Sequence, residues 1–188
     1  MKKRYLIEGD KVFLRYVEER DTEWMYEVIN DKEFRRKYEQ GREPTTKETL
    51  RERNKERNEE MRNANATGFT FVVVEKGENK EIGTVSMNNI DWNSGNGELG
   101  LAIHDRSYWD LEYEKDAARA VMKHFFFSRR LHRIQVCLNS GNKKAVAECK
   151  ELGFVEEGTM KDFYFQDGRF QDVVVLGILD AEFKARMG

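Results

Sequence analysis

Acidic side chains gather at the start of one expected helix, which the apolar spacing places at about residues 112–130. The carboxylates are those of Asp110, Glu112, Glu114 and Asp116. A helix N-terminus attracts negative charge, because its first N–H groups lack helical partners and the helix dipole is positive there. Each carboxylate in the first turn contributes about 0.3–1 kcal/mol. We therefore expect Glu112, Glu114 and Asp116 to stabilise this helix start in the protein without ligand.

The cysteines and histidines predict neither a disulfide framework nor a metal site. The chain has two cysteines, Cys137 and Cys149, and three histidines scattered through its second half. Cys149 lies on the apolar stripe of a short helix expected at 143–152, which indicates a buried and unreactive thiol. We expect no metal.

The residues described above must be positioned by strands and helices. Apolar runs typical of strands recur along the chain and predict seven strands. A hairpin follows near the end of the chain, with Asp167 and Gly168 at its turn because this pair adopts positive φ readily. The expected strands cover residues 11–17, 69–75, 82–91, 98–103, 134–138, 154–165 and 170–179.

Four helices are expected between these strands. Asp21 is the predicted N-cap of the first helix, and Thr45 with Glu48 forms a predicted capping box for the second. The second helix carries few apolar residues, which indicates an exposed flap or lid. Gly153 is the expected C-cap of the last helix. The last three helices cover about 46–63, 112–130 and 143–152.

The order of elements predicts one α/β (α+β) domain that spans residues 1–188. We expect a mixed, mostly antiparallel sheet of about seven strands, flanked by about four helices. The net charge of −2 argues against a nucleic-acid partner. No apolar run is long enough for a membrane span, and the N-terminus lacks a signal-peptide core. We expect a cytoplasmic protein without a membrane partner, and a homodimer is compatible with the sequence.

Three ordered segments together resemble the GNAT superfamily of N-acetyltransferases. The first is a strand, acidic turn and helix start that ends at Asp21. The second runs from Ile82-Gly83 through Glu98-Leu99-Gly100 to Tyr108-Trp109. The third runs from His132-Arg133-Ile134 through Asn142 and Leu152-Gly153-Phe154 to a segment that begins with Asp167-Gly168 and ends at Asp172. The last turn is typical of the branch that contains ribosomal-protein alanine and spermidine acetyltransferases.

This resemblance implies acetyl transfer from acetyl-CoA to a primary amine, on a protein N-terminus, a polyamine or another small amine. The excess of acidic residues favours a cationic acceptor. In the family, the pantetheine arm lies between two splayed strands, and a Gly-rich loop before a helix binds the pyrophosphate. The residues at matching positions are Leu101, Ala102, Ile103, Asp110, Leu111, Glu112, Tyr113, Glu114, Lys115 and Asn142.

The resemblance also suggests two catalytic residues. Glu98 stands where many relatives place a catalytic or substrate-orienting carboxylate, although a strand Glu beside a Gly-rich turn can also be an ordinary edge residue. Cys149 stands where many relatives carry the tyrosine that reprotonates the CoA thiolate. The buried thiol described above is the alternative for Cys149. Asn142 can both contact pantetheine and cap its own helix.

The phosphate loop departs from the family pattern, because acids replace its small residues at Asp110, Glu112 and Glu114. One carboxylate about 6 Å from a phosphate charge costs roughly 3 kcal/mol at an effective dielectric constant near 20. This departure predicts weak or absent CoA binding. The alternative function is therefore a catalytically impaired GNAT-fold protein that acts as a binding or scaffold module.

Overall fold

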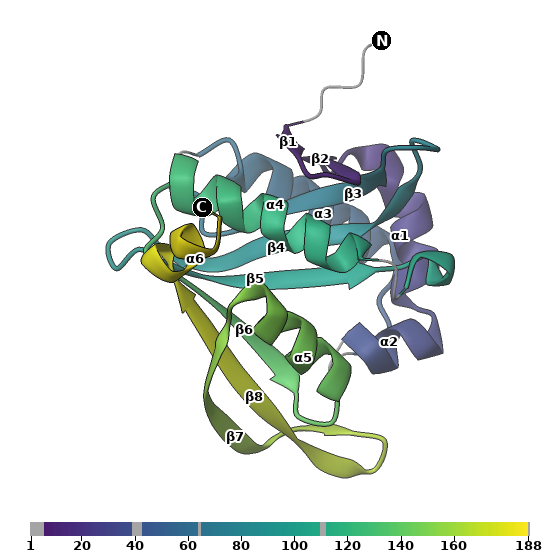
Figure 1. Ribbon diagram of the computed structural model, residues 1–188. Coiled ribbons are helices and arrows are strands. Elements are labelled where there is room, and N and C mark those ends of the chain that lie inside the picture. Colours follow the sequence, from purple (N-terminus) through teal and green to yellow (C-terminus); the bar gives the residue numbers. More distant parts are fainter. Residues whose placement is uncertain (1–5, 39–42, 64, 110–111, 188) are drawn as a thin grey trace.

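The protein is built on one eight-stranded sheet (Figure 1). The computed structural model describes residues 6–38, 43–63, 65–109 and 112–187. Within them the strand order is β1-β2-β3-β4-β5-β6-β8-β7, and every neighbouring pair is antiparallel except β5 with β6. The strands are β1 (Ile7–Glu8), β2 (Val12–Tyr16), β3 (Phe69–Glu75), β4 (Glu81–Asp91), β5 (Asn96–Ile103), β6 (Arg133–Asn139), β7 (Val155–Gln166) and β8 (Arg169–Leu179).

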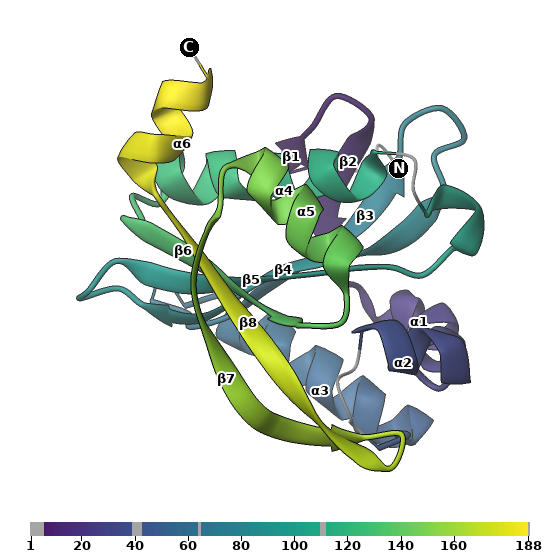
Figure 2. The ribbon, with the colours of Figure 1, turned by 60° about the horizontal axis from the view of Figure 1, so that its bottom comes forward.

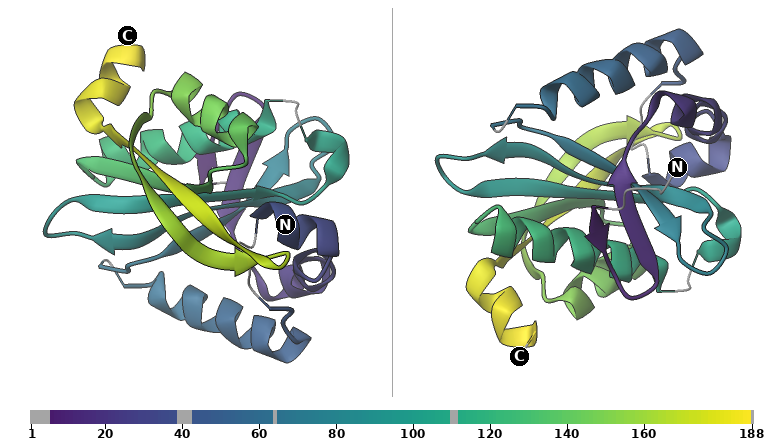
Figure 3. Two further views of the ribbon diagram at one scale, coloured as in Figure 1. Left: turned by 90° about the horizontal axis from the view of Figure 1, so that it is seen from below. Right: turned by 90° about the horizontal axis from the view of Figure 1, so that it is seen from above.

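Helices cover both faces of this sheet (Figure 3). The first three lie on one face, and α4, α5 and α6 lie on the other, where α4 packs across β2, β4 and β5. A π-helical turn, His124–Ser128, continues α4. The α-helices of the described chain are α1 (Thr22–Ile29), α2 (Lys32–Tyr38), α3 (Lys47–Glu60), α4 (Tyr113–Lys123), α5 (Lys143–Leu152) and α6 (Asp180–Met187). None of the described helices is long and apolar enough to cross a membrane.

The predicted fold class is confirmed, with more elements than expected. All the expected strands are present, and α5 matches its predicted bounds and ends at Gly153 with φ 105°. The short elements β1, α2 and α6 were not predicted. Each carries too little apolar pattern to be recognised, since α2 buries only Phe34 and α6 buries only Phe183.

The N-cap of α3 is Thr46, so the prediction of Thr45 was wrong by one residue. The Thr46 hydroxyl accepts a hydrogen bond from the Thr49 N–H at 3.1 Å. Thr45 is held outside the helix instead, because its N–H donates to Asn30 and its carbonyl accepts from the same Asn30 side chain. The contact with the Asn30 side chain therefore keeps Thr45 outside α3, which begins one residue later than predicted.

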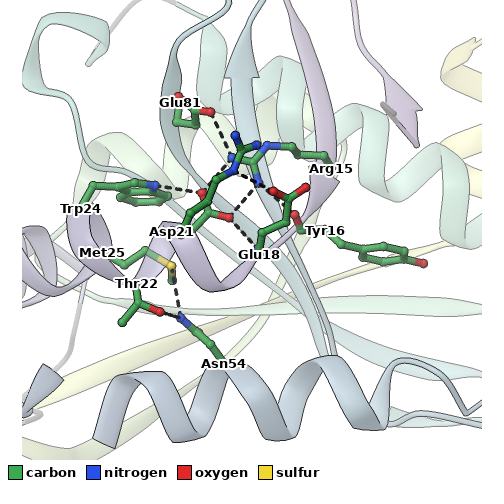
Figure 4. Close-up of polar contacts among 10 residues, drawn as sticks. Arg15, Tyr16, Glu18, Asp21, Thr22, Trp24, Met25, Asn54 and Glu81 are labelled. Atoms are coloured by element: carbon green, nitrogen blue, oxygen red, sulfur yellow. Dashed lines mark hydrogen bonds and ion pairs between the residues drawn. The ribbon is translucent and has the colours of Figure 1, made fainter. Parts of the chain in front are cut away.

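The helix α3 is anchored to its neighbours rather than being wholly exposed. Leu50 is 1 % exposed and Asn54 is 2 % exposed. The Asn54 amide donates to the Thr22 hydroxyl of α1 at 3.3 Å, and Figure 4 shows it reaching up between Thr22 and Met25. This contact fixes which side of α3 faces the sheet.

A buried ion pair fixes α1 (Figure 4). Arg15 of β2 donates two hydrogen bonds to the Asp21 carboxylate, at 2.7 and 2.8 Å, and the Trp24 indole donates to the same carboxylate at 3.1 Å. Burial raises the pKa of Asp21, but these bonds and the Glu18 N–H outweigh it, so the pKa lies below its ordinary value. Asp21 occupies the N-cap position as predicted, yet its side chain makes no capping bond to α1.

The central feature of the sheet is the separation of β5 from β6. These parallel strands pair only at Asn96 with Arg133, Gly97 with Ile134 and Glu98 with Gln135. Residues 99–103 and 136–139, all of which the structure describes, continue as strands without pairing to each other. The gap that opens beyond Glu98 agrees with the splayed strands that the family resemblance implies.

The hairpin of β7 and β8 extends beyond the rest of the sheet. Its turn is formed by Asp167 and Gly168, with φ of 52° and 78°, as predicted from this residue pair. Only residues 173–179 of β8 pair with β6, so the distal part of the hairpin extends beyond β6 past the α3 side of the molecule (Figure 2). Its turn contacts α2, where Asp167 pairs with Arg36 at 3.0 Å.

Candidate functional site

A cleft of about 750 Å³ passes through the gap between β5 and β6. Helices from both faces of the sheet line it, so it has an α1–α3 half and an α4–α5 half. Strands β3 to β6 contribute its floor and inner walls: Thr70, Thr84, Ser86, Asn88, Asn89, Glu98, Leu99, Gly100, Leu101, Ala102, Val136, Cys137 and Leu138.

Glu98 lies where the two strands separate. Its half-buried side chain is flanked by Asn88, its direct cross-strand neighbour on β4, and by Gln135, whose amide donates to the Glu98 carboxylate at 3.4 Å. The Asn88 amide donates in turn to the Ser86 hydroxyl at 2.9 Å. Gly100 leaves room for this row, because a Cβ there would lie 2.7 Å from the Ser86 hydroxyl oxygen. Glu98 is thus a carboxylate on a polar strand face that opens into the cleft.

The α1–α3 half is closed by an aromatic pair at the end of β5. The ring of His104 lies 4.3 Å from that of Trp24, and both side chains line the cleft. Burial lowers the pKa of His104 to about 4, although nearby Asp105 opposes the shift. The imidazole is therefore neutral at neutral pH. Its Nε2 is buried and has no hydrogen-bond partner in the described part of the chain.

The predicted pantetheine residues divide into those that reach the cleft and one that does not. Leu101, Ala102 and Asn142 line it. Asn142 also caps α5, because its side-chain oxygen accepts from the Ala145 N–H at 3.1 Å. Ile103 is fully buried in the core, and its carbonyl accepts from the Trp109 indole at 2.7 Å, so this residue does not line the cleft.

Cys149 lines the α4–α5 half of the cleft. Burial raises the pKa of its thiol to about 12, with further contributions from the charges of Glu148 and Glu114. The thiol is therefore neutral at physiological pH, and it is a weaker acid than an ordinary thiol with a pKa near 8.5. These properties are those of an unreactive, half-buried cysteine.

The acids at the start of α4 contact other groups rather than capping their own helix. Glu112 is at the N-cap with φ 68°, makes no capping bond, and pairs with Lys115 at 2.6 Å. Tyr113 packs on Tyr108. Asp110 and Leu111, the other two residues predicted at this loop, lie outside the described residues.

Glu114 joins α4 to α2. It accepts a hydrogen bond from the Tyr38 hydroxyl at 2.5 Å and lies 3.6 Å from the Lys37 ammonium. Burial and the Glu114 charge both raise the pKa of Tyr38, which keeps the phenol protonated as the donor. Burial lowers the pKa of Lys37, which Glu114 opposes, and the Lys37 ammonium also lies 4.0 Å from the centre of the Trp109 ring. Glu114 and Lys115 both line the cleft.

Asp116 has a purely structural set of contacts. Its carboxylate is buried and accepts the backbone N–H groups of Asp10, Lys11 and Val12 at 2.7–3.1 Å. It therefore holds the turn between β1 and β2 against α4. Asp116 thus connects the start of α4 to a turn of the sheet.

A second, smaller hollow of about 270 Å³ lies between the start of α4 and α5. Four carboxylates and two ammonium groups line it, and Lys115 pairs with both Glu112 and Glu151. Its lining residues are Glu112, Glu114, Lys115, Lys144, Ala147, Glu148 and Glu151.

Several lining residues were missed by the sequence analysis. Ser86 and Asn88 alternate with buried residues along β4, so their polar period of two could have identified them. Arg53 and Arg57 also line the cleft from α3. Their helix is so charged that its sequence does not distinguish these two from their solvated neighbours.

The family described as "Acetyltransferase (GNAT) domain" matches residues 11–155. The putative ribosomal N-acetyltransferase YdaF of Bacillus subtilis is 29 % identical over 108 residues, covering 54 % of this chain and 55 % of the relative. The spermidine N(1)-acetyltransferase of Vibrio cholerae is 29 % identical over 114 residues, covering 61 % and 65 %. The chain thus spans less than two thirds of the length of these curated relatives.

The fold has a close counterpart among solved structures. The crystal structure of spermidine N-acetyltransferase from Vibrio cholerae in complex with CoA and spermine superposes with a TM-score of 0.82 at 24 % identity. The match covers 94 % of this chain and 99 % of that one. At 24 % identity, this superposition shows that the two chains share a fold.

Proposed function

Because this chain belongs to the family of GNAT acetyltransferases, we propose that it transfers an acetyl group from acetyl-CoA to a primary amine. The observation that carries this proposal is the cleft between β5 and β6, with Glu98 at the point where the strands separate. Such a gap exposes unpaired strand backbone to a ligand and joins the two faces of the sheet. Two substrates can therefore meet there from opposite sides.

The residues of the α4–α5 half fit an extended, partly apolar ligand that ends in phosphates. Leu101, Ala102 and Asn142 would contact the pantetheine arm along the open edge of β5. Lys115 and Lys144, now paired with carboxylates, are the cations that phosphate groups would meet at the smaller hollow. When bound, acetyl-CoA supplies an acetyl group activated as a thioester.

Glu98 would act as the base. It accepts one proton from the acceptor ammonium, directly or through a water molecule, which frees the nitrogen lone pair to attack the acetyl carbon. Ser86 and Asn88 would orient the amine beside it. After the attack, the nitrogen would release its second proton to solvent as the carbon–sulfur bond breaks. The leaving sulfur would take a proton from solvent, because the Cys149 thiol, with a pKa of about 12, is too weak an acid to supply it.

The test is a turnover assay with acetyl-CoA and a panel of primary amines, following free CoA and the acetylated product by mass spectrometry. Glu98→Gln should lower kcat by about 100-fold and leave the Kd for CoA unchanged. Its activity should recover partly at high pH, where the amine is already neutral. The matched control is Glu59→Gln on the exposed surface of α3, which should keep full activity. Full activity in Glu98→Gln would remove Glu98 from the mechanism.

A protein that has lost CoA binding is the second candidate function. Glu112 and Glu114 favour it, because both carboxylates stand where the family resemblance places the pyrophosphate. In that case the cleft would bind a partner without turnover. Failure of CoA to bind, together with failure of every amine in the panel, would support this second function.

A further inference from the structure

We infer that the amine acceptor carries a carboxylate, which Arg53 and Arg57 of α3 bind while the amine points toward Glu98. This inference rests on the proposed function and names the acceptor class for the same site. It makes the acceptor an anionic or zwitterionic amine rather than a polycation. The observation behind it is a difference in charge within the α1–α3 half. Two guanidinium groups stand on α3, and the Glu98 carboxylate stands on the strand floor.

The orientation of α3 places both guanidinium groups at the cleft. Arg53 and Arg57 are one helical turn apart, so they lie on the same side of α3. Leu50 and Asn54 are buried beside them, and the Asn54 contact with Thr22 fixes the rotation of the helix. Both arginines line the cleft, yet both remain exposed enough to meet a ligand entering from solvent.

Three carboxylates line the cleft among the described residues, and Glu98 is the one on the strand floor. Glu114 and Glu148 stand on α4 and α5, and Glu114 is already bound by Tyr38 and Lys37 of α2. The strand floor offers hydroxyl and amide groups, from Thr84, Ser86 and Asn88, which bind ligands without a charge preference. His104 is neutral at neutral pH. A polycation would therefore meet two guanidinium groups on α3 before its amine reached Glu98.

An amine that also bears a carboxylate complements both sets of charges: its carboxylate suits Arg53 and Arg57, and its amine suits Glu98. Guanidinium groups bind carboxylates through paired, charge-assisted hydrogen bonds. The net charge of −2 favours cationic acceptors over the molecule as a whole, but a nearby charge acts more strongly than distant ones, which salt screens. The same chemistry is found in free amino acids and in acidic peptide N-termini.

The first test compares three amines that share a four-carbon chain: 4-aminobutyrate, butylamine and putrescine. Their far ends are anionic, neutral and cationic. We expect kcat/KM to fall in that order, by about tenfold between 4-aminobutyrate and putrescine, because ion pairs of exposed guanidinium groups are individually weak. Putrescine as the best acceptor would overturn the inference and leave the proposed function intact. Two peptides, beginning Ala-Glu-Glu and Ala-Lys-Lys, then distinguish an acidic peptide from a free amino acid as the source.

The second test asks whether Arg53 and Arg57 cause the preference for 4-aminobutyrate, by reversing their charge. The double variant Arg53→Glu, Arg57→Glu should invert the order of the three amines, whereas Arg53→Lys should preserve it. Lys55→Glu is the matched control, since Lys55 is exposed on α3 and does not line the cleft. An unchanged order in the double variant, with its fold confirmed by circular dichroism, would contradict the inference.

Binding measured without turnover separates this inference from the proposed function. Saturation-transfer NMR of 4-aminobutyrate and putrescine with the protein needs no acetyl transfer. Preferential binding of 4-aminobutyrate that Arg53→Glu, Arg57→Glu abolishes would support the inference even if every turnover assay failed. Equal or stronger binding of putrescine would overturn it.

Discussion

Glu112 holds a backbone conformation that side chains with a Cβ rarely adopt. Its φ of 68° lies in the left-handed region, where glycine is tolerated without steric cost. The family pattern has a small residue in this loop, so the strain and the negative charge both arise from one departure. The consequences of Glu112 can therefore be divided into backbone strain, which affects stability, and negative charge, which affects CoA binding.

Substitution of this residue should separate the two effects. Glu112→Gly should raise the free energy of unfolding by about 0.5–1 kcal/mol, because relief of strain exceeds loss of the exposed pair with Lys115. Glu112→Gln removes the charge and keeps the strain, so it should give no such gain. Both variants should bind CoA more tightly, to a similar extent. Chemical denaturation and calorimetry measure these quantities, and a Gly variant less stable than the Gln variant would contradict the strain.

Single residues of the site could be predicted only in part. The resemblance identified Glu98, Leu101, Ala102 and Asn142, and each of them lies at the cleft. Ile103 was predicted too, but its side chain is fully buried in the core and does not line the cleft. The arginines of α3 were not predicted, because an exposed charged helix has no periodicity that marks the residues facing a cleft.

At the scale of elements, Asp116 joins the first hairpin to α4. Its buried carboxylate accepts hydrogen bonds from three consecutive backbone N–H groups, and the bond from Val12 is itself buried. Gly9 is required beside it, since a Cβ at that residue would lie 2.6 Å from a carboxylate oxygen. A residue predicted to serve one helix thus connects two elements more than 100 positions apart in the sequence.

Asp116→Ala should lower the free energy of unfolding by about 2–4 kcal/mol, because it leaves three N–H groups without an acceptor. Asp10→Ala is the matched control, since the Asp10 side chain is exposed and its N–H remains. The control should change stability by less than about 0.5 kcal/mol. Equal stability of Asp116→Ala and the wild type in urea denaturation would refute the structural role.

Elements with strong apolar patterns could be predicted, and elements held by few contacts could not. The strand β3 is buried along its whole length, and its bounds follow from its sequence. The helix α2 buries only Phe34 and is held by the contact of Tyr38 with Glu114, which links segments far apart in the chain. Such a contact leaves no local signal.

At the scale of the molecule, the buried pair of Arg15 and Asp21 attaches α1 to the sheet and thereby shapes one wall of the cleft. Asp21→Asn leaves Glu81, at 3.1 Å, as the remaining carboxylate beside the buried Arg15 guanidinium, so it should lower stability at pH 7 by about 3 kcal/mol, the low end for a broken buried pair. The pKa of Asp21 is lower folded than unfolded, so its contribution is full above the unfolded value near 3.9 and is lost as the pH falls through the folded value.

The stability difference between wild type and Asp21→Asn should therefore be constant from pH 7 to about pH 5 and shrink below about pH 4. Urea denaturation at several pH values measures it. Glu23→Gln, an exposed neighbour on the same helix, is the control and should show no such dependence. A difference that grows on acidification would contradict the lowered pKa.

The architecture of the sheet could be predicted from strand and helix order, but the gap that defines the site could not. Nothing in the patterns of residues 98–103 and 134–138 shows that β5 and β6 pair at three positions and then separate. That expectation came from the resemblance to a known family. The cleft is therefore a property of the whole sheet, and it is the feature on which the functional account depends.

Calorimetric titration of CoA into the purified protein tests this account most directly. If the cleft between β5 and β6 receives the acetyl donor, CoA should bind at one site per chain with a Kd of tens of micromolar or tighter, about −6 kcal/mol or more favourable. The charge-removing Glu112→Gln variant should bind several-fold more tightly. The gain is smaller than the roughly 3 kcal/mol of an unscreened carboxylate, because Glu112 is exposed and solvent screens its charge. No heat of binding at millimolar CoA, in the wild type and in Glu112→Gln alike, would contradict the account.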